Sequence, residues 1–238
     1  MLPLIILLAV LNIIIVFYIV QYFFGKKALA NNIYLKDSPA DISSNEITNP
    51  RSILYTFGTW VYVNNFSNAT LFSYITSATN ISSPLFSLVL GGFNDGFKNK
   101  PTLRAFITGT SSTGNAMNIV TLSNNFPIQK WVYVTVSVDT TYVDCYLDGK
   151  LVVSKKLEKQ VTNSPTTDPY ITFKGMANQY QKPDIYLTKL TRWDKPLDPQ
   201  SVYNEYTAGN GVKQLKYTFG IYTKSDDDAK NEYKIYSS

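Results

Sequence analysis

Hydrophobic and polar residues alternate with a period of two along much of the chain after residue 52, which is the pattern of β-strands with one buried face. The clearest run is Trp131–Val138, in which every second residue is valine. The same alternation continues over Val143–Leu147 and is followed by Asp148-Gly149. Glycine tolerates the positive φ that a two-residue hairpin turn needs. The sequence therefore predicts a hairpin here, with Lys150–Leu157 as the returning strand.

Other short runs rich in β-branched and aromatic residues predict further strands. They are Ile53–Val63, Thr70–Ile75, Leu85–Leu90, Leu103–Thr108, Asn118–Leu122 and Ile185–Trp193. One short helix is expected after them, because Asp198 can cap it, Pro199 fits its first turn and Gly209 can end it. Many short strands with little helix predict an all-β fold, an antiparallel jelly-roll sandwich.

The N-terminal segment has a different pattern, since Leu2–Phe24 contains no charged residue. As a helix it would be about 34 Å long, enough to cross a bilayer. A cleaved signal peptide would be shorter and preceded by basic residues, and a buried core helix would carry a polar face. We therefore expect one transmembrane helix that binds the lipid membrane through residues 2–24. Lys26 and Lys27 follow it and place the large domain on the cytosolic side.

These patterns divide the chain into four parts. Residues 1–25 are the expected anchor, and the polar stretch 26–51 is the expected linker. Residues 52–212 are the expected jelly-roll domain. Residues 213–238 are expected to be a charged, tyrosine-containing tail, in which Leu215–Tyr222 could add one strand.

Three glycosylation sequons oppose the cytosolic orientation. They begin at Asn65, Asn68 and Asn80. The chain is rich in Asn, Ser and Thr, so such triplets also arise by chance, and we expect them to be unused.

Composition excludes several kinds of chemistry. The chain has no histidine and a single cysteine, Cys145. A Ser-His-Asp triad, a Cys-His pair, a histidine-liganded metal and an intramolecular disulfide are therefore impossible. The formal net charge is +5, from 22 basic and 17 acidic residues. The basic residues are scattered, so no nucleic-acid partner is expected.

Several pieces of the chain match a known family in order. Trp131–Asp139 followed by Val143–Val152 resembles the tryptophan-led strand and Tyr-hydrophobic-Asp-Gly-Lys hairpin of the laminin-G-like, concanavalin A-like lectin and glucanase superfamily. Phe57–Val63 resembles its early strand, Ile185–Trp193 its closing strand, and Lys195–Gly209 the helix that follows. The resemblance implies a jelly-roll fold over residues 52–212. Members of this superfamily hydrolyse polysaccharides, bind ligands with calcium or dock onto other molecules, so these three functions have to be weighed.

The sequence lacks the residue patterns that hydrolysis and calcium binding would need. The hydrolytic branch carries paired acids in a Glu-x-Asp-x-x-Glu strand, which this chain does not have. Asp144 and Asp148 would lie about 13 Å apart, too far for a retaining glycosidase pair. Candidate calcium ligands at strand edges are Asp139, Asp168 and Asp184, and Asp226–Asp228 fits a solvated tail better. We predict no catalytic, cofactor-binding or metal-binding residues, and no enzyme activity.

Aromatic residues could instead stack on sugars, and the chain has 18 tyrosines, 13 phenylalanines and 3 tryptophans. Trp60, Trp131 and Trp193 have apolar neighbours, so we expect them in the core rather than on a sugar-binding surface. Cys145 alternates with apolar residues and is expected to be buried and inert.

The resulting hypothesis is a structural interaction protein, anchored in a membrane and docking onto a protein layer. The layout and the Asn-, Tyr- and Ile-rich composition resemble minor capsid proteins, or virion membrane proteins, of large DNA viruses, where such a domain would lie between the internal membrane and the capsid. The alternative is an exoplasmic lectin-like carbohydrate-binding or adhesion module.

Overall fold

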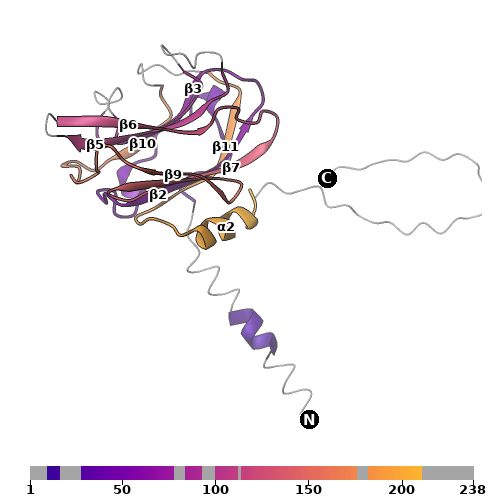
Figure 1. Cartoon of the computed structure of the whole chain (residues 1–238). Helices are drawn as coiled ribbons and strands as arrows, with labels where there is room; N and C mark the ends of the chain where they lie inside the picture. The colour runs from indigo at the N-terminus through magenta and orange to yellow at the C-terminus, as the bar shows by residue number, and fades with distance from the viewer. Residues whose placement is uncertain are drawn as a thin grey trace, which may run out of the picture.

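The computed structural model describes residues 10–16, 28–77, 84–92, 100–111, 114–175 and 182–210. Two antiparallel sheets stack face to face in it (Figure 1). The six-stranded sheet has the order β1-β11-β2-β7-β8-β9, and the five-stranded sheet has the order β10-β3-β4-β5-β6. The expected antiparallel β-sandwich is confirmed.

The strands of the six-stranded sheet are β1 (Ile33–Tyr34), β11 (Ile185–Trp193), β2 (Tyr55–Val63), β7 (Trp131–Val138), β8 (Tyr142–Leu147) and β9 (Lys150–Lys156). Those of the other sheet are β10 (Tyr170–Thr172), β3 (Ala69–Ile75), β4 (Phe86–Leu90), β5 (Leu103–Ser111) and β6 (Gly114–Ser123). The predicted hairpin joins β8 to β9, and both turn residues have positive φ, 49° at Asp148 and 74° at Gly149.

The alternation predicted from the sequence sets the core. One face of each sheet points inward and supplies one continuous apolar cluster between the sheets. The valines of β7 lie on this inner face, as do Phe57 of β2 and Phe86 of β4, whose rings stack with centroids 4.9 Å apart. Cys145 is also there and fully buried, which confirms the prediction of its burial.

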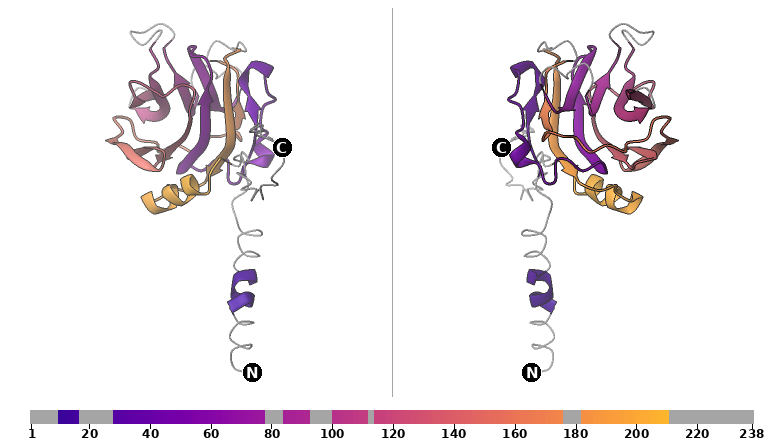
Figure 2. Two further views of the ribbon diagram at one scale, coloured as in Figure 1. Left: turned by 90° about the vertical axis from the view of Figure 1, so that its right-hand side faces the viewer. Right: turned by 90° about the vertical axis from the view of Figure 1, so that its left-hand side faces the viewer.

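The outer face of the six-stranded sheet is covered in part by α2 (Pro199–Thr207), the helix that follows β11 (Figure 2). Asp198 caps it as predicted, because its carboxylate accepts a hydrogen bond of 3.0 Å from the Ser201 N–H. A second apolar cluster lies between α2 and the sheet and consists of Trp60, Tyr133, Tyr146, Trp193, Leu197 and Val202.

The prediction of a linker over 26–51 is wrong for the described residues from 28 onward. Ile33 pairs with Leu187 of β11, and Ile42 forms a bridge with Ile171 of β10. Ile33, Leu35, Ile42 and Ile47 are buried in the core. These apolar residues recur too irregularly for a strand or helix pattern, so their burial depends on the sandwich that they cover.

The predicted anchor lies mostly outside the described residues. Residues 10–16 are helical and their apolar side chains are exposed, with Ile13 69% exposed. No helix within the described ranges is both long and apolar enough to span a membrane. The predicted tail, 213–238, also lies outside the described residues.

Candidate functional site

A row of four aromatic side chains crosses the outer face of the six-stranded sheet, beside the part that α2 covers. It consists of Tyr34 of β1, Tyr186 of β11, Tyr62 of β2 and Trp131 of β7. Each is directly opposite the next in the strand register. Directly opposed aromatic pairs are favourable contacts across strands. The row therefore follows from the register of four neighbouring strands, and we call it the aromatic row.

The rings of the aromatic row contact one another. Tyr34 and Tyr186 stack with centroids 4.3 Å apart and an interplanar angle of 6°. Tyr62 lies 6.3 Å from Tyr186 and 5.4 Å from Trp131. Tyr186 is 37% exposed and the other three are partly exposed. The stacking covers one face of Tyr34 and one face of Tyr186.

One end of the aromatic row is fixed by a carboxylate. The hydroxyl of Tyr34 donates a hydrogen bond of 3.1 Å to Asp184. The amides of Asn64 and Asn65 donate to the same carboxylate, at 2.7 and 3.0 Å. The hydrogen bond from Asn64 is the largest cause that holds the pKa of Asp184 below its usual value. The row therefore has a fixed, negatively charged end.

The three tryptophans separate into two environments. Trp60 and Trp193 are buried, at 8% and 7% exposure, which confirms the expectation for these two residues. They lie beneath α2 on the outer face, rather than between the sheets. The expectation is wrong for Trp131, which is partly exposed in the aromatic row. On the outer face of β7, α2 therefore covers Tyr133 but leaves Trp131 partly exposed.

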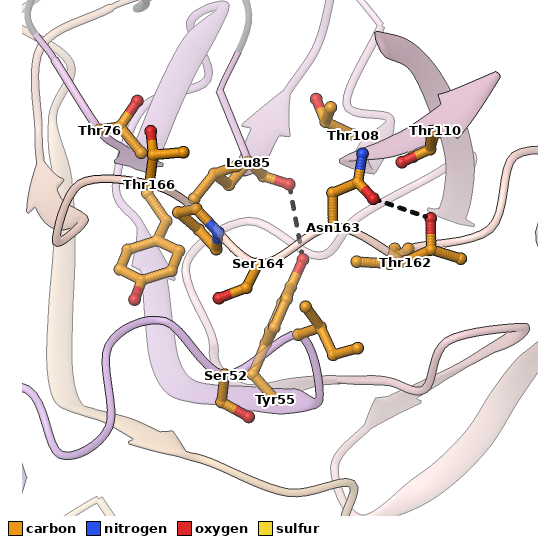
Figure 3. Close-up of a pocket in the computed structure, with 15 residues that line it drawn as sticks. Ser52, Tyr55, Thr76, Leu85, Thr108, Thr110, Thr162, Asn163, Ser164 and Thr166 are labelled. Carbon is orange, nitrogen blue, oxygen red and sulfur yellow. Dashed lines mark hydrogen bonds between the residues drawn. The ribbon is translucent and has the colours of Figure 1, made fainter. Parts of the chain in front are cut away.

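A second candidate site is a cavity of about 320 Å³ that residues of both sheets line (Figure 3). Nine of its 15 lining residues carry a hydroxyl group and none carries a charge. The hydroxyl-bearing residues are Ser52, Tyr55, Tyr74, Thr76, Thr108, Thr110, Thr162, Ser164 and Thr166. The strands β2, β3 and β5 and the segment after β9 bring them together. We call it the hydroxyl cavity.

Several hydroxyls of this cavity donate to main-chain carbonyls. Thr108 donates to Pro84 at 2.6 Å, and Ser164 donates to Arg51 at 2.8 Å. Tyr74 donates to Pro50, and burial raises the pKa of this phenol to about 12. A hydroxyl that donates its hydrogen still has lone pairs. The cavity is therefore suited to a neutral ligand that carries several hydrogen-bond donors.

The candidate calcium ligands do not come together. Asp184 holds the end of the aromatic row, Asp168 pairs with Arg51 at 2.5 Å, and Asp139 accepts hydrogen bonds from Thr140. Within the described ranges no group of three His, Cys, Asp or Glu residues could hold a metal ion. Asp226–Asp228 lies outside these ranges.

The candidate hydrolytic pair, Asp144 and Asp148, occupies positions that stabilise the fold. Asp148 accepts a hydrogen bond of 2.9 Å from the Tyr133 N–H and pairs with Lys130 at 3.4 Å, so it fixes the turn after β8. Asp144 lies on β8 opposite Ser137. Burial raises the pKa of the Cys145 thiol, which opposes a role as nucleophile.

Two of the three sequon asparagines lie in the described residues. Asn65 is exposed and donates to Asp184, while Asn68 is partly buried next to Gly91. Asn80 lies outside the described residues. Use of these sequons stays a prediction.

Sequence reasoning missed both candidate sites. The aromatic row joins residues 34 and 186, so finding it requires the pairing of four strands. A weak signal was present, because Tyr62, Trp131 and Tyr186 occupy alternating positions on the polar faces of predicted strands. The hydroxyl cavity has no motif, since its hydroxyls come from four separate parts of the chain.

Solved structures with a similar fold include three botulinum neurotoxin domains. The receptor binding domain of the C/D mosaic serotype is 12% identical, with a TM-score of 0.49, covering 71% of this chain and 39% of that chain. The serotype D ligand binding domain in complex with N-acetylneuraminic acid is 14% identical, with a TM-score of 0.48 and 68% and 38% coverage. The DC binding domain in complex with rat synaptotagmin II is 13% identical, with a TM-score of 0.48 and 74% and 40% coverage. This chain spans about two fifths of their length.

No curated protein sequence matches this one. A family comparison does match, over residues 36–203, which is most of the sandwich and α2 up to Tyr203. It begins within the segment that packs on the sandwich before β2, so it includes the buried residues Ile42 and Ile47. The chain belongs to the concanavalin A-like lectin/glucanases superfamily.

Proposed function

We propose that this chain is a non-catalytic binding protein whose sandwich docks onto another protein through the aromatic row. The observation that carries the proposal is that four partly exposed aromatic side chains form a continuous line across four strands. Tyrosine and tryptophan are enriched at protein interfaces, where a large apolar body and a polar tip are both useful.

The ring orientation favours a protein partner over a sugar. A sugar that stacks on tyrosine needs an open ring face, and the stacking of Tyr34 on Tyr186 at 4.3 Å already covers one face of each ring. The exposed parts of the four side chains can instead pack against side chains and main-chain groups of a protein. The carboxylate of Asp184 at the end of the row adds an acceptor for a donor of the partner.

We further propose the finer role of a minor capsid or virion membrane protein of a large DNA virus. Residues 2–24 would bind the lipid membrane and the sandwich would contact other capsid proteins from the cytosolic side. The charge-free segment and the layout of the chain support this proposal. An endoglycosidase that shifts the mobility of the membrane-inserted chain would overturn the cytosolic placement. Protease access to the sandwich in sealed vesicles, without such a shift, would support it.

Site-specific photo-cross-linking tests the docking surface. A benzophenone amino acid at Tyr186 should give a discrete protein adduct in the producing cells, and Tyr62→Ala should weaken it. Tyr142 of β8 is the matched control, because it is 51% exposed and lies outside the row. Adducts of equal yield from position 142, or no protein adduct from position 186, would rule the aromatic row out as the docking surface.

The second candidate function is a lectin-like module, and the hydroxyl cavity favours it. A volume of about 320 Å³ fits a monosaccharide-sized ligand, and the uncharged lining fits a neutral one. Thr108→Val should abolish binding of a neutral sugar identified on a glycan array, whereas Tyr186→Ala should leave it unchanged. Sugar binding that depends on Tyr186 instead would transfer the lectin function to the aromatic row.

A further inference from the structure

A third site lies between α2 and the six-stranded sheet. It is a cavity of about 770 Å³ beside the C-terminal half of the helix. Its lining residues are Ala28, Asn31, Trp60, Tyr133, Lys189, Thr191, Asn204, Glu205, Thr207 and Ala208. None of them belongs to the aromatic row or to the hydroxyl cavity, so it is a separate site, which we call the helix cavity.

A bulge in β11 turns Lys189 toward the helix cavity. The pairing of β11 with β2 shifts between Thr188 and Thr191, and Lys189 has a φ of 51°. Positive φ costs free energy in a residue with a side chain, and bulges often redirect side chains at functional sites. The Lys189 ammonium donates to Gly209 at 2.7 Å and to Ala208 at 3.4 Å. One ammonium is therefore already bound where the C-terminal end of a helix favours cations.

The other polar side chains at this wall have partners within the protein. Thr191 donates to the Lys189 carbonyl at 3.2 Å, and Thr207 donates to the Asn204 carbonyl at 3.0 Å. The side-chain oxygen of Asn204 accepts a hydrogen bond of 3.0 Å from Gln200. These groups are satisfied without a ligand.

Glu205 differs from them. Its carboxylate is half-buried, and no hydrogen bond or ion pair joins it to another residue in the described part of the chain. Burial raises its pKa, although Lys189 acts in the opposite direction. A partly desolvated carboxylate without a donor is unfavourable, and a cationic group that reached it would relieve this cost.

Aromatic rings form the floor beside this carboxylate. The centroids of Trp60 and Tyr133 lie 5.3 Å apart, and Tyr206 of α2 stacks on Trp60 at 5.6 Å. The indole Nε1–H of Trp60 is buried and has no hydrogen-bond partner among the described residues. Aromatic rings attract cations through their faces, and since Tyr206 covers one face of Trp60, only the part of the rings that lines the cavity can do so here. The carboxylate and the rings thus favour positive charge, while the carbonyls at the end of α2 are already occupied by the Lys189 ammonium.

We propose that the helix cavity receives a cationic side chain of a protein partner, the ammonium of a lysine or the guanidinium of an arginine. The cation pairs with Glu205 and lies against Trp60 and Tyr133. Lys189 does not occupy this position, because its own ammonium is held by the carbonyls at the end of α2. The partner's being a protein rests on the proposed function, while the cation preference rests on the cavity alone.

The test uses the full chain in a non-ionic detergent, with the tryptophan indole N–H signals observed by NMR. The probes are Nα-acetyl-lysine amide and Nα-acetyl-arginine amide, with Nα-acetyl-glutamine amide as the neutral control. The basic probes should bind with a Kd on the order of 1–10 mM, as expected for one charge-assisted contact, and shift the Trp60 signal. Glu205→Gln should weaken them about tenfold. The matched control Glu158→Gln, an exposed acid on another face, should change nothing.

A second variant tests the cavity itself. Thr207→Lys places a lysine at the cavity wall and should block the basic probes by competition. Equal binding of the glutamine probe, or unchanged affinity in Glu205→Gln, would overturn the proposal. Tyr186→Ala should leave probe binding intact. Failure of the probes would therefore be distinct from failure of the aromatic row as a docking surface.

Discussion

Thr56 of β2 and Ser137 of β7 lie directly opposite each other on the outer face of the six-stranded sheet and share one donor. The hydroxyl of Thr56 is 3.1 Å from that of Ser137. The main-chain N–H of Leu197 donates to both, at 3.1 Å and 3.0 Å. All three residues are buried. This shared hydrogen bond fastens the connection between β11 and α2 to the sheet.

We predict that the effects of mutating this pair are not additive. Thr56→Val or Ser137→Ala alone leaves the Leu197 N–H with one acceptor, so each should lower the free energy of unfolding by about 1 kcal/mol. The double variant leaves the N–H buried without an acceptor and should cost about 1–3 kcal/mol beyond the sum. Urea unfolding of the four proteins measures this coupling. Strict additivity would show that Leu197 finds another acceptor.

Arg192 should be among the most sensitive positions in the sandwich. It is buried, lies over the rings of Tyr55 and Tyr74, and donates to the carbonyls of Thr48, Asn49 and Ser52.

Arg192→Met removes the charge together with these bonds, and we expect a loss of about 2–4 kcal/mol in the free energy of unfolding. Hydrogen exchange should then rise first in residues 48–52, because the guanidinium holds this segment. Loss of protection spread evenly over both sheets would contradict this local role. Arg51→Met is the control, since its ion pair with Asp168 is exposed.

Gly109 of β5 should tolerate no side chain. A Cβ there would lie 2.1 Å from the Lys159 carbonyl oxygen, in a segment that Asn118 also holds through two hydrogen bonds of 2.8 and 3.0 Å. Gly109→Ala must therefore move the chain that continues over the hydroxyl cavity. We expect a loss of about 1–3 kcal/mol and the loss of any sugar binding there.

Gly209→Ala is the matched control for Gly109→Ala. No atom lies within 4 Å of a Cβ at Gly209, but its φ is +73°. It should cost about 1 kcal/mol through backbone conformation and leave the hydroxyl cavity intact. Thermal unfolding and a sugar titration of both variants separate the two effects, and sugar binding retained in Gly109→Ala would exclude this cavity as the sugar site.

Acid should weaken the end of the aromatic row. The folded-state pKa of Asp184 lies below its ordinary value, chiefly because Asn64 donates to it. The contribution of this group to stability is therefore fully present above the unfolded pKa of about 3.9, and it is lost as the pH falls through the folded value. Asp184→Asn should flatten the stability curve below about pH 4. If the loss of stability at low pH is unchanged in the variant, other carboxylates determine it.

Strand positions could be predicted where the alternation was long. The run Trp131–Val138 and the Asp148-Gly149 turn lead to one hairpin geometry, because a shift by one residue would expose every valine. The strands β1 and β10 span only Ile33–Tyr34 and Tyr170–Thr172, too few residues for a pattern. They form because the neighbouring strands offer them free main-chain groups. Their positions therefore depend on the assembled sheet and cannot be read from the segments themselves.

The candidate sites could not be predicted for a related reason. Tyr34 and Tyr186 are 152 positions apart in the sequence, and their stacking depends on the register of β1 with β11. The helix cavity depends on the bulge at Lys189, whose position no alternation of residues indicates. Local patterns determine which face of a strand is apolar, but contacts across several strands require the assembled sheets.

The single thiol of Cys145 allows the opening of the sandwich to be measured by chemical labelling. It is fully buried between the two sheets, and no other cysteine exists in the chain. A thiol reagent can reach it only when the sheets open. Its labelling rate therefore reports how often the sheets open around β8 in the native protein, without any denaturant. Any cysteine introduced at the surface would, by contrast, be the one site that labels in the folded protein.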